Sequence, residues 1–354
     1  WEKRFPHFLT DIIYHRFALG SPTIDAASGN IFCMTSAGVL CCFSDAGDLL
    51  WEHATISEFG RLVFPNGRTG SVALTDELAI LHMTSSGWGP QGPARDRFFA
   101  FDKLTGECVW VSTPGGPPKD ISFSMPVLSW QNGRQVAYAG LAGGHMACVD
   151  ARTGEALWRF PMCTGGMSSS AVLYKDTLIA IHGKENLDTS TAGRMIAIKL
   201  GAEPKPGEPQ LVLGKDHEVW RNDLTAFTSS PILVGNRVYT TIATGELACV
   251  DADTGKVLWE HKLAPDQIHA SPAYGDGRLW VPMNNGEFFI VKPSDEGMKV
   301  LEKAQLDGNC LGAPAICHGR VYVHTTEALY CFAGTGTDTP SSARAIVAME
   351  TGAP

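Results

Sequence analysis

The chain has 354 residues, a formal net charge of −9, 44% hydrophobic and 18% charged residues, with 38 Gly and 21 Pro. The acidic balance argues against nucleic acid as a partner, because binding to its backbone requires clustered Lys and Arg. No run reaches the roughly 18 apolar residues of a membrane-spanning helix. Few charges with many Gly and Pro are typical of short strands joined by tight turns.

The start of the chain and its cysteines bear on compartment and chemistry. The chain begins with Trp1 rather than Met, so we expect a processed or trimmed product whose signal peptide is not visible. Ten cysteines are present, but no Cys-x-x-Cys pair suits zinc and no Cys-x-x-Cys-His motif suits covalent haem.

One repeated element is a strand, a Thr-Gly turn and a second strand that ends at Trp. It reads Asp-x-x-Thr-Gly-x-x-x-Trp at 102–110, 150–158 and 251–259, with degenerate copies at 44–51 and around 292–297. The Gly supplies the positive φ that such a turn requires. Repeated hairpins of this kind predict repeated four-stranded sheets.

A second element opens each unit, and it is a small residue, often followed by Pro, before an apolar strand. Pro is tolerated at the first residue of a strand because no ladder hydrogen bond is lost there. The seven units begin near Gly20, Gly70, Ser124, Ser169, Ser229, Ala270 and Gly312. We therefore predict an all-β, seven-bladed β-propeller of four-stranded antiparallel blades.

The two ends of the chain are expected to close this propeller. The seventh unit lacks a Trp-bearing strand, and residues 1–6 resemble residues 158–161, so the N-terminal strand is expected to complete the last blade. Closure removes the sheet edges that favour aggregation. A single domain over 1–334 follows, with 335–354 as a flexible tail or linker.

The repeat also explains residues that look chemical. Six of nine tryptophans fall on the last strands of units, where they are expected to dock one blade on the next. Cys42, Cys148, Cys249 and Cys331 share one position, with Ala100 in a fifth unit, as expected for a small buried residue. Cys41 and Cys42 are adjacent in a strand and therefore point to opposite faces.

The repeated motif resembles the PQQ-like repeat of quinoprotein dehydrogenases and of the outer-membrane assembly lipoprotein of Gram-negative bacteria. The likeness runs from Trp1 to about Phe332. It implies the fold and an extracytoplasmic, periplasmic bacterial protein. Two departures stand out, since those relatives resemble eight-bladed rings, and the calcium ligands and catalytic Asp of the dehydrogenases have no evident match.

Two long loops are expected at the mouth of the central channel, where ligands commonly bind. The candidate ligand-binding residues in them are Trp88, Arg95, Arg97, Lys184, Glu185, Asn186 and Asp188. Four histidines approach the same face and are candidate ligands for a transition metal, namely His82, His182, His269 and His324. The alternative is that each histidine is hydrogen-bonded within its own loop.

Three functions remain open at this point. The first is a non-catalytic binding or scaffold module in a larger extracytoplasmic bacterial assembly, with proteins as partners. The second is an oxidoreductase that binds pyrroloquinoline quinone with Ca²⁺. The third is a metal-assisted, lyase-like enzyme that acts on a glycan or small molecule at the channel mouth, with a His as base and Arg95 or Arg97 as charge stabiliser.

Overall fold

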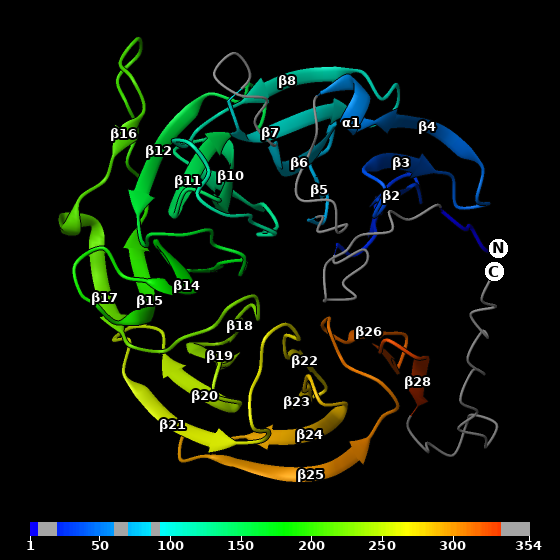
Figure 1. Ribbon diagram of the computed structural model, residues 1–354, viewed down its shortest axis with the longest axis vertical. Coiled ribbons are helices and arrows are strands. Elements are labelled where there is room, and N and C mark those ends of the chain that lie inside the picture. Colours follow the sequence, from blue (N-terminus) through cyan, green and yellow to red (C-terminus); the bar gives the residue numbers. More distant parts are fainter. Residues whose placement is uncertain (6–19, 60–69, 86–92, 334–354) are drawn as a thin grey trace. The chain divides into compact units, whose positions relative to one another are not determined.

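The computed structural model describes residues 1–5, 20–59, 70–85 and 93–333. In these ranges the chain forms seven sheets, which are antiparallel except where β16 pairs in parallel with β12, together with one short helix α1 (Thr55–Glu58) and one 3₁₀ turn η1 (Lys215–His217). The prediction of an all-β, seven-bladed β-propeller is confirmed (Figure 1).

By internal packing the chain divides into two compact units. The first comprises Trp1–Gly193 with Ala197–Val219, and the second comprises Arg194–Ile196 with Trp220–Pro354. The sequence predicts one domain over residues 1–334 and a tail over residues 335–354. Residues 334–354 lie outside the described part, so this tail stays a prediction.

The first unit holds the first three sheets and most of the fourth (Figure 1). Their strands follow chain order across each sheet. The first sheet is β1 (Thr23–Ile24), β2 (Ile31–Met34), β3 (Val39–Phe43) and β4 (Leu49–Ala54), and the second is β5 (Ala73–Leu74), β6 (Leu78–Ser85), β7 (Arg95–Asp102) and β8 (Cys108–Ser112). The third is β9 (Val127–Gln131), β10 (Arg134–Gly140), β11 (His145–Asp150) and β12 (Ala156–Pro161), to which β16 (Leu211–Val212) adds a fifth strand; the fourth is β13 (Val172–Tyr174), β14 (Thr177–Glu185), β15 (Ala192–Lys199) and β17 (Glu218–Asn222).

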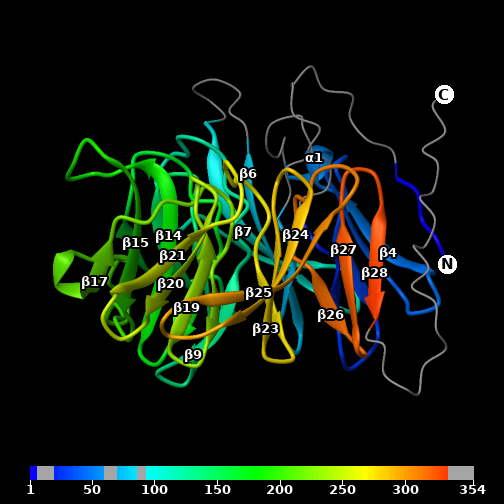
Figure 2. The ribbon, with the colours of Figure 1, turned by 90° about the horizontal axis from the view of Figure 1, so that it is seen from below.

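The second unit holds the last three sheets (Figure 2). The fifth sheet is β18 (Ile232–Val234), β19 (Arg237–Thr241), β20 (Glu246–Asp251) and β21 (Val257–Lys262), and the sixth is β22 (Ala273–Gly275), β23 (Arg278–Pro282), β24 (Glu287–Pro293) and β25 (Met298–Gln305). The seventh is β26 (Ala315–Cys317), β27 (Arg320–His324) and β28 (Leu329–Ala333). Residues 1–5 carry no strand assignment, so their addition to the seventh sheet stays a prediction.

The predicted starts of the units match the structure closely. Each first strand begins three residues after the predicted start, from Gly20 and Thr23 in the first unit of the repeat to Gly312 and Ala315 in the last. Serine hydroxyls join successive starts within each compact unit. The backbone N–H of Ser21 donates to Ser71 Oγ (2.9 Å), and that of Ser230 donates to Ser271 Oγ (2.9 Å). The small polar residue of the motif therefore links neighbouring sheets.

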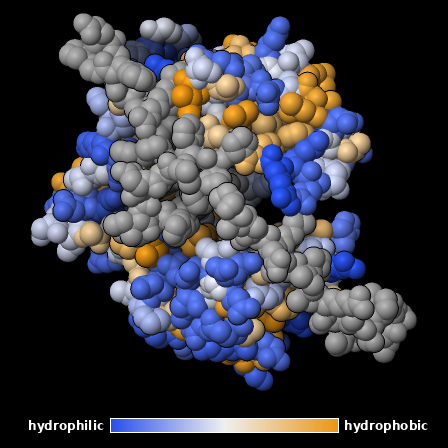
Figure 3. Space-filling model, turned by 45° about the vertical axis from the view of Figure 1, so that its right-hand side comes forward, coloured by the Kyte–Doolittle hydropathy of each residue, from blue (hydrophilic) through white to orange (hydrophobic). Residues whose placement is uncertain are grey.

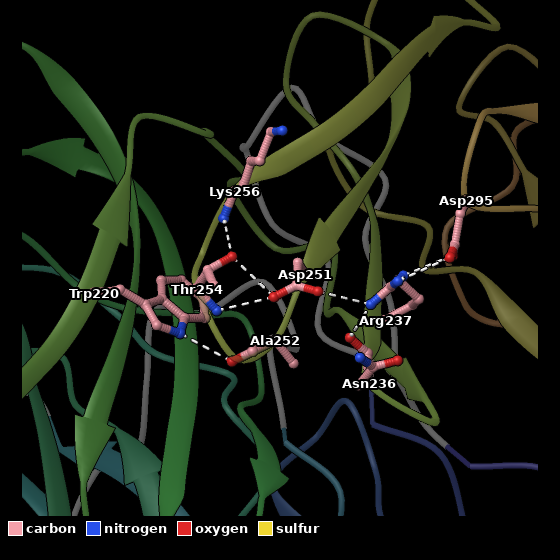
Figure 4. A network of polar contacts seen from close by, with 8 residues as sticks. All are labelled: Trp220, Asn236, Arg237, Asp251, Ala252, Thr254, Lys256 and Asp295. Atoms are coloured by element: carbon pink, nitrogen blue, oxygen red, sulfur yellow. Dashed lines mark hydrogen bonds and ion pairs between the residues drawn. The ribbon is translucent and has the colours of Figure 1, made fainter.

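The Asp of the repeated hairpin organises its turn. Asp102 Oδ1 accepts hydrogen bonds from the backbone N–H groups of Leu104 (2.9 Å) and Thr105 (2.8 Å). The hydrogen bond from Thr105 lowers the pKa of the Asp102 carboxyl below its ordinary value. In the second compact unit, Asp251 accepts from Thr254 (3.0 Å) and also pairs with Arg237 (2.8 Å), as Figure 4 shows.

The indoles of Trp51 and Trp220, on the last strands of their sheets, each lie against the hairpin turn of the following sheet. Trp51 Nε1 donates to the carbonyl of Lys103 (3.0 Å), and a Cβ added at Gly106 would lie 2.8 Å from the Trp51 ring. Trp220 makes the same bond to Ala252 (2.9 Å; Figure 4). The Gly of the motif is therefore required for a positive φ and for close approach of the indole.

Trp1 takes the same position against the first sheet. Its Nε1 donates to the carbonyl of Asp45 (2.8 Å), and a Cβ at Gly47 would lie 2.6 Å from its ring. Trp1 and Phe5 also contact the Phe43 ring, each with a centroid separation of 6.0 Å. This contact is what the last-strand Trp of a preceding blade would make, which supports the expected closure.

The core lies between neighbouring sheets. Phe32, Leu40 and Cys42 of the first sheet pack with Leu81 and Phe99 of the second in one buried cluster. Similar clusters join the second sheet to the third, the fifth to the sixth and the sixth to the seventh. The shared cysteine position is buried at Cys42, Cys148 and Cys249 and partly buried at Cys331, in line with its interpretation as a small packing residue.

Candidate functional site

His82 takes part in a buried link between the second and third sheets. It lies on β6 and is 2% exposed, and its Nε2 is 2.6 Å from Asp96 Oδ1 on β7. Asp96 is fully buried, and its Oδ2 accepts the backbone N–H of Ala142 (2.5 Å). The carboxylate therefore joins β6 to the loop after β10, and His82 serves as its partner.

His182 and His269 also bond within their own surroundings. His182 is 1% exposed on β14, and its Nδ1 lies 3.1 Å from the carbonyl oxygen of Lys184. His269 is 8% exposed, and its Nδ1 lies 2.8 Å from Thr228 Oγ1. These contacts orient the imidazoles toward nearby loop atoms.

The fourth histidine, His324, ends β27 and is exposed, and burial of part of its ring lowers its pKa below the ordinary value. Among the described residues, no group of three or more His, Cys, Asp or Glu side chains lies close enough to hold a metal ion. Within each compact unit, the candidate histidines therefore belong to no such group among the described residues.

The Arg95 to Arg97 segment is part of a strand rather than a loop. Both arginines are partly buried on β7, where they pair with Ser85 and Met83. Arg95 Nη1 donates to the carbonyl of Ala94 (3.1 Å). Trp88, from the same predicted loop, lies outside the described residues.

The candidate residues of the second loop hold that loop in shape. Lys184 Nζ lies 2.6 Å from Asp120 Oδ2, and Asp188 Oδ2 lies 3.2 Å from Lys215 Nζ. Asn186 is 4% exposed, and its Nδ2 donates to the carbonyl of Thr191 (2.9 Å). The segment is thus held by polar contacts both within the loop and to Asp120 and Lys215 outside it.

Glu185 contributes to this loop through its backbone. Its side chain is exposed at the end of β14, and its carbonyl accepts the N–H of Thr164 (3.0 Å). Among the candidate residues of this loop, Glu185 differs in that its contact with Thr164 is made by the backbone, while its side chain is exposed.

The sequence reasoning missed a cavity of about 520 Å³ in the second compact unit. It is lined by Asn222, Asp223, Leu224, Thr225, Ile242, Thr244, Val257 and Glu260. Two of these residues are acidic and none is basic, so the cavity suits neutral or cationic groups. No repeat signal marks it, because its residues lie at the end of β17 and just after it, between β19 and β20, and on β21, at positions that the repeated motif leaves variable.

A second missed feature is the outermost strand of the second sheet, β8. Charged residues lie on the corresponding strands β4, β12, β17, β21 and β25, whereas β8 (Cys-Val-Trp-Val-Ser) has none. Val109 is 52% exposed and Val111 is 47% exposed. Within the part of the chain that the structure describes, β8 ends its sheet and no strand pairs with its outer edge.

In the third sheet, the corresponding outer strand β12 has a strand partner on its outer edge. Strand β12 carries one charged residue, Arg159, and is covered by β16, which pairs with it in parallel (Figure 1). Trp158 is opposite Leu211 in this pairing, and the N–H of Leu213 donates to the carbonyl of Arg159 (2.9 Å). The chain therefore provides its own added strand at one weakly charged edge.

A family model described as Outer membrane protein assembly factor BamB matches residues 7–202 and 212–309. The chain belongs to this family. The resemblance to PQQ-like repeat proteins inferred from the repeat is thereby confirmed. The BamB of Burkholderia pseudomallei (strain K96243) is 31% identical over 102 residues, or 28% of this chain and 26% of that protein. The aligned part thus spans about a quarter of that relative.

Solved structures show the same fold at low sequence identity. The BamB from Moraxella catarrhalis has a TM-score of 0.62 at 14% identity, over 87% of this chain and 82% of that one. A europium-containing methanol dehydrogenase has a TM-score of 0.59 at 15% identity, over 85% and 72%. The designed protein Ika8 has a TM-score of 0.56 at 14% identity, over 93% and 87%. These similarities concern the fold alone.

The described residues include no helix that is both long and apolar enough to cross a membrane.

Proposed function

We propose that this protein is a non-catalytic, protein-binding scaffold of an outer-membrane protein assembly machinery, and that it acts in the periplasm. The observation that carries the proposal is the match to the BamB family over residues 7–202 and 212–309. The contacts of two polar residues in the candidate loops agree with a structural rather than a chemical role, because Asp96 binds the backbone of Ala142 and Asn186 binds that of Thr191.

The fold similarity to a methanol dehydrogenase does not favour an oxidoreductase. That similarity is at 15% identity, where a shared fold carries no shared site. Cys41 and Cys42 are both free thiols, and they are opposite Glu52 and Trp51 respectively on β4. Since neighbours in a strand point to opposite faces, the pair does not present one joint surface to a cofactor.

The binding surface that we assign to this function is the outer edge of β8. An uncharged edge strand presents unpaired backbone N–H and C=O groups, and proteins usually protect such edges with charges or with a covering strand. Strand β12 has the covering strand, and β4, β21 and β25 have charges. The edge of β8 has neither among the described residues.

The partner that fits this edge is an extended segment of another protein, with alternating apolar side chains and few charges. Such a segment would add to β8 through main-chain hydrogen bonds, as peptides add to exposed sheet edges elsewhere. Val109 and Val111 flank Trp110 beside a register irregularity of β8, and both are about half exposed, so apolar side chains of the partner would pack against them. The pairing of β16 with β12 provides the model for this contact.

The cellular function is tested by deleting the gene in the organism that makes the protein. The proposal predicts lower amounts of outer-membrane β-barrel proteins, measured by quantitative mass spectrometry of isolated outer membranes, and unchanged amounts of soluble periplasmic proteins. Unchanged β-barrel protein amounts would argue directly against an assembly role. Restoring the intact gene should return them to the starting values.

The binding surface is tested by Val109→Lys with Val111→Lys. Lysines on this edge should reduce recovery of outer-membrane assembly proteins with the full-length protein by at least about tenfold, because an inserted strand would have to desolvate them. Val300→Lys on β25 is the matched control, since Val300 is also an exposed outer-strand valine, at 44%. Equal loss with both variants, or no loss with the first, would exclude β8 as the docking edge.

A further inference from the structure

Two cysteines of the first sheet are not explained by the repeat. Cys42 occupies the repeated cysteine position and packs in the core, but Cys33 and Cys41 occupy a different pair of positions, directly opposite each other on β2 and β3. The corresponding opposite pairs in other sheets are Ala139 with Ala147, Thr240 with Ala248, and Val281 with Phe289. Packing at this position therefore does not require sulfur.

The register places the two cysteines at a distance suited to a disulfide. The N–H of Thr35 donates to the carbonyl of Val39 (2.9 Å), and alternation along the ladder makes Cys33 and Cys41 a hydrogen-bonded pair as well. Such pairs have Cα atoms about 5.5 Å apart, which lies within the range of about 4.4–6.8 Å found for disulfides. The two side chains also share a hydrogen bond, so the thiols lie next to each other.

The thiols of Cys33 and Cys41 differ in their exposure and in their pKa. Cys41 is 1% exposed, whereas Cys33 is only partly buried and can meet a reagent from solution. The hydrogen bond with Cys41 lowers the pKa of the Cys33 thiol. The same hydrogen bond, together with burial, raises the pKa of Cys41 well above its ordinary value. Cys33 is therefore the thiol that ionises first.

We propose that Cys33 and Cys41 form an intramolecular disulfide that ties β2 to β3 when the protein meets a disulfide oxidant. The Cys33 thiolate attacks one sulfur of the oxidant, forms a mixed disulfide and releases one thiolate. The Cys41 thiol loses its proton and attacks Cys33 Sγ, which forms the new bond and releases the second thiolate. The two cysteines lose two electrons and two protons in total, and the oxidant is reduced to two thiols.

The bond would fasten the hairpin on which the start of the chain rests. Cys33, Cys41 and Phe43 alternate onto one face of the first sheet, and Phe43 on that face contacts the rings of Trp1 and Phe5. Oxidising compartments such as the periplasm are where disulfides persist. The inference stands on the geometry of β2 and β3, so its failure would leave the proposed scaffold function untouched.

The test uses the full chain, reduced, desalted and incubated with oxidised glutathione. Free thiols are then blocked with N-ethylmaleimide in denaturant and counted by intact mass spectrometry. Because the exposed Cys108 and Cys317 can also react, peptide mapping then follows Cys33 and Cys41 themselves. The wild type and Cys42→Ala should each lose both of these blocked thiols relative to their reduced samples, with no glutathione on Cys33. Cys33→Ala and Cys41→Ala should not show this loss.

The variants also separate a failure of chemistry from a failure of folding. Ala139 and Ala147 occupy the equivalent pair in the third sheet, so alanine at positions 33 and 41 is compatible with this fold. Circular dichroism of each variant checks this. Three outcomes would overturn the proposal. Cys33 and Cys41 could both stay reduced in the wild type, or glutathione could remain stably bound to Cys33. The third is a bond between Cys41 and Cys42, which Cys42→Ala would abolish.

Discussion

The outer strands of the second and third sheets, β8 and β12, occupy the same place in the repeat but have different neighbours. Strand β12 pairs with β16, whereas β8 has no strand partner among the described residues. Strand β16 lies in residues 200–217, which connect β15 to β17. Strand β12, which carries the single charge of Arg159, is covered, whereas β8 carries no charge and has no covering strand among the described residues. The comparison therefore identifies β8 as the less protected edge, where we propose that a partner binds.

The largest effect is expected where β12 is anchored. Trp158 is fully buried, so Trp158→Ala should lower the free energy of unfolding by about 3–5 kcal/mol, because a large cavity is left. Urea denaturation followed by tryptophan fluorescence and circular dichroism measures this. Trp130→Ala in the same sheet is the control, since Trp130 is 71% exposed and should change stability by less than about 0.5 kcal/mol. Similar losses for both would contradict the anchoring role of Trp158.

The link between the second and third sheets should rank next. Asp96→Asn removes the buried carboxylate that holds His82 and the N–H of Ala142, so we expect a loss of about 2–4 kcal/mol in urea denaturation. Asp188→Asn provides the comparison, because its partly exposed pair with Lys215 should be worth less than about 1 kcal/mol. If Asp96→Asn were as mild as Asp188→Asn, the link would not be structural.

Uncovering β12 should make it behave like β8. Leu213→Pro removes the N–H that bonds to Arg159, and should cost about 1–2 kcal/mol beyond Leu213→Ala, which keeps that N–H. Hydrogen exchange of the β12 amides should become faster in the proline variant, and size-exclusion chromatography should show more self-association. Unchanged exchange would show that β16 does not protect this edge.

The smallest effect is expected for the pH dependence of stability that His145 causes on β11, the strand that pairs with β12. Burial, with Coulombic repulsion from Arg159 and Lys119, lowers the pKa of His145 to about 4, against an ordinary value of 6.5. Between these values the unfolded chain binds the proton more readily than the folded chain, so stability falls as pH drops from about 6.5 toward 4. His145→Gln should reduce this loss when urea midpoints at pH 7 and pH 5 are compared. An unchanged pH dependence would assign it to other groups.

The fold could be predicted because the repeat encodes local physics at each copy. The Asp-x-x-Thr-Gly turn needs Asp102 Oδ1 as acceptor and Gly106 at positive φ, and both requirements are visible in one sequence. The small residues that open each unit were visible too. Their bonding role was not, because the bond from Ser230 to Ser271 joins residues of two different sheets.

The candidate site was harder to predict because it depends on which polar groups meet in space. His82 is predicted from sequence as a candidate metal ligand, and its partner Asp96 lies between Arg95 and Arg97 in a segment that is predicted to be a loop. In the structure the segment from Arg95 to Asp102 is a strand, β7. The uncharged edge of β8 could have been found from sequence by comparing the charges of the outer strands, since Val109 and Val111 flank a repeat tryptophan.

The most direct test of the binding edge is site-specific photo-crosslinking in living cells. A photoreactive amino acid at Val109 on β8 should give crosslinks to outer-membrane assembly proteins, and the same amino acid at Val300 on β25 or at Val212 on β16 should not. All three positions are exposed, at 52%, 44% and 58%, so accessibility does not explain a difference. Crosslinks of equal yield at the three positions, or none at Val109 while the others react, would contradict the account.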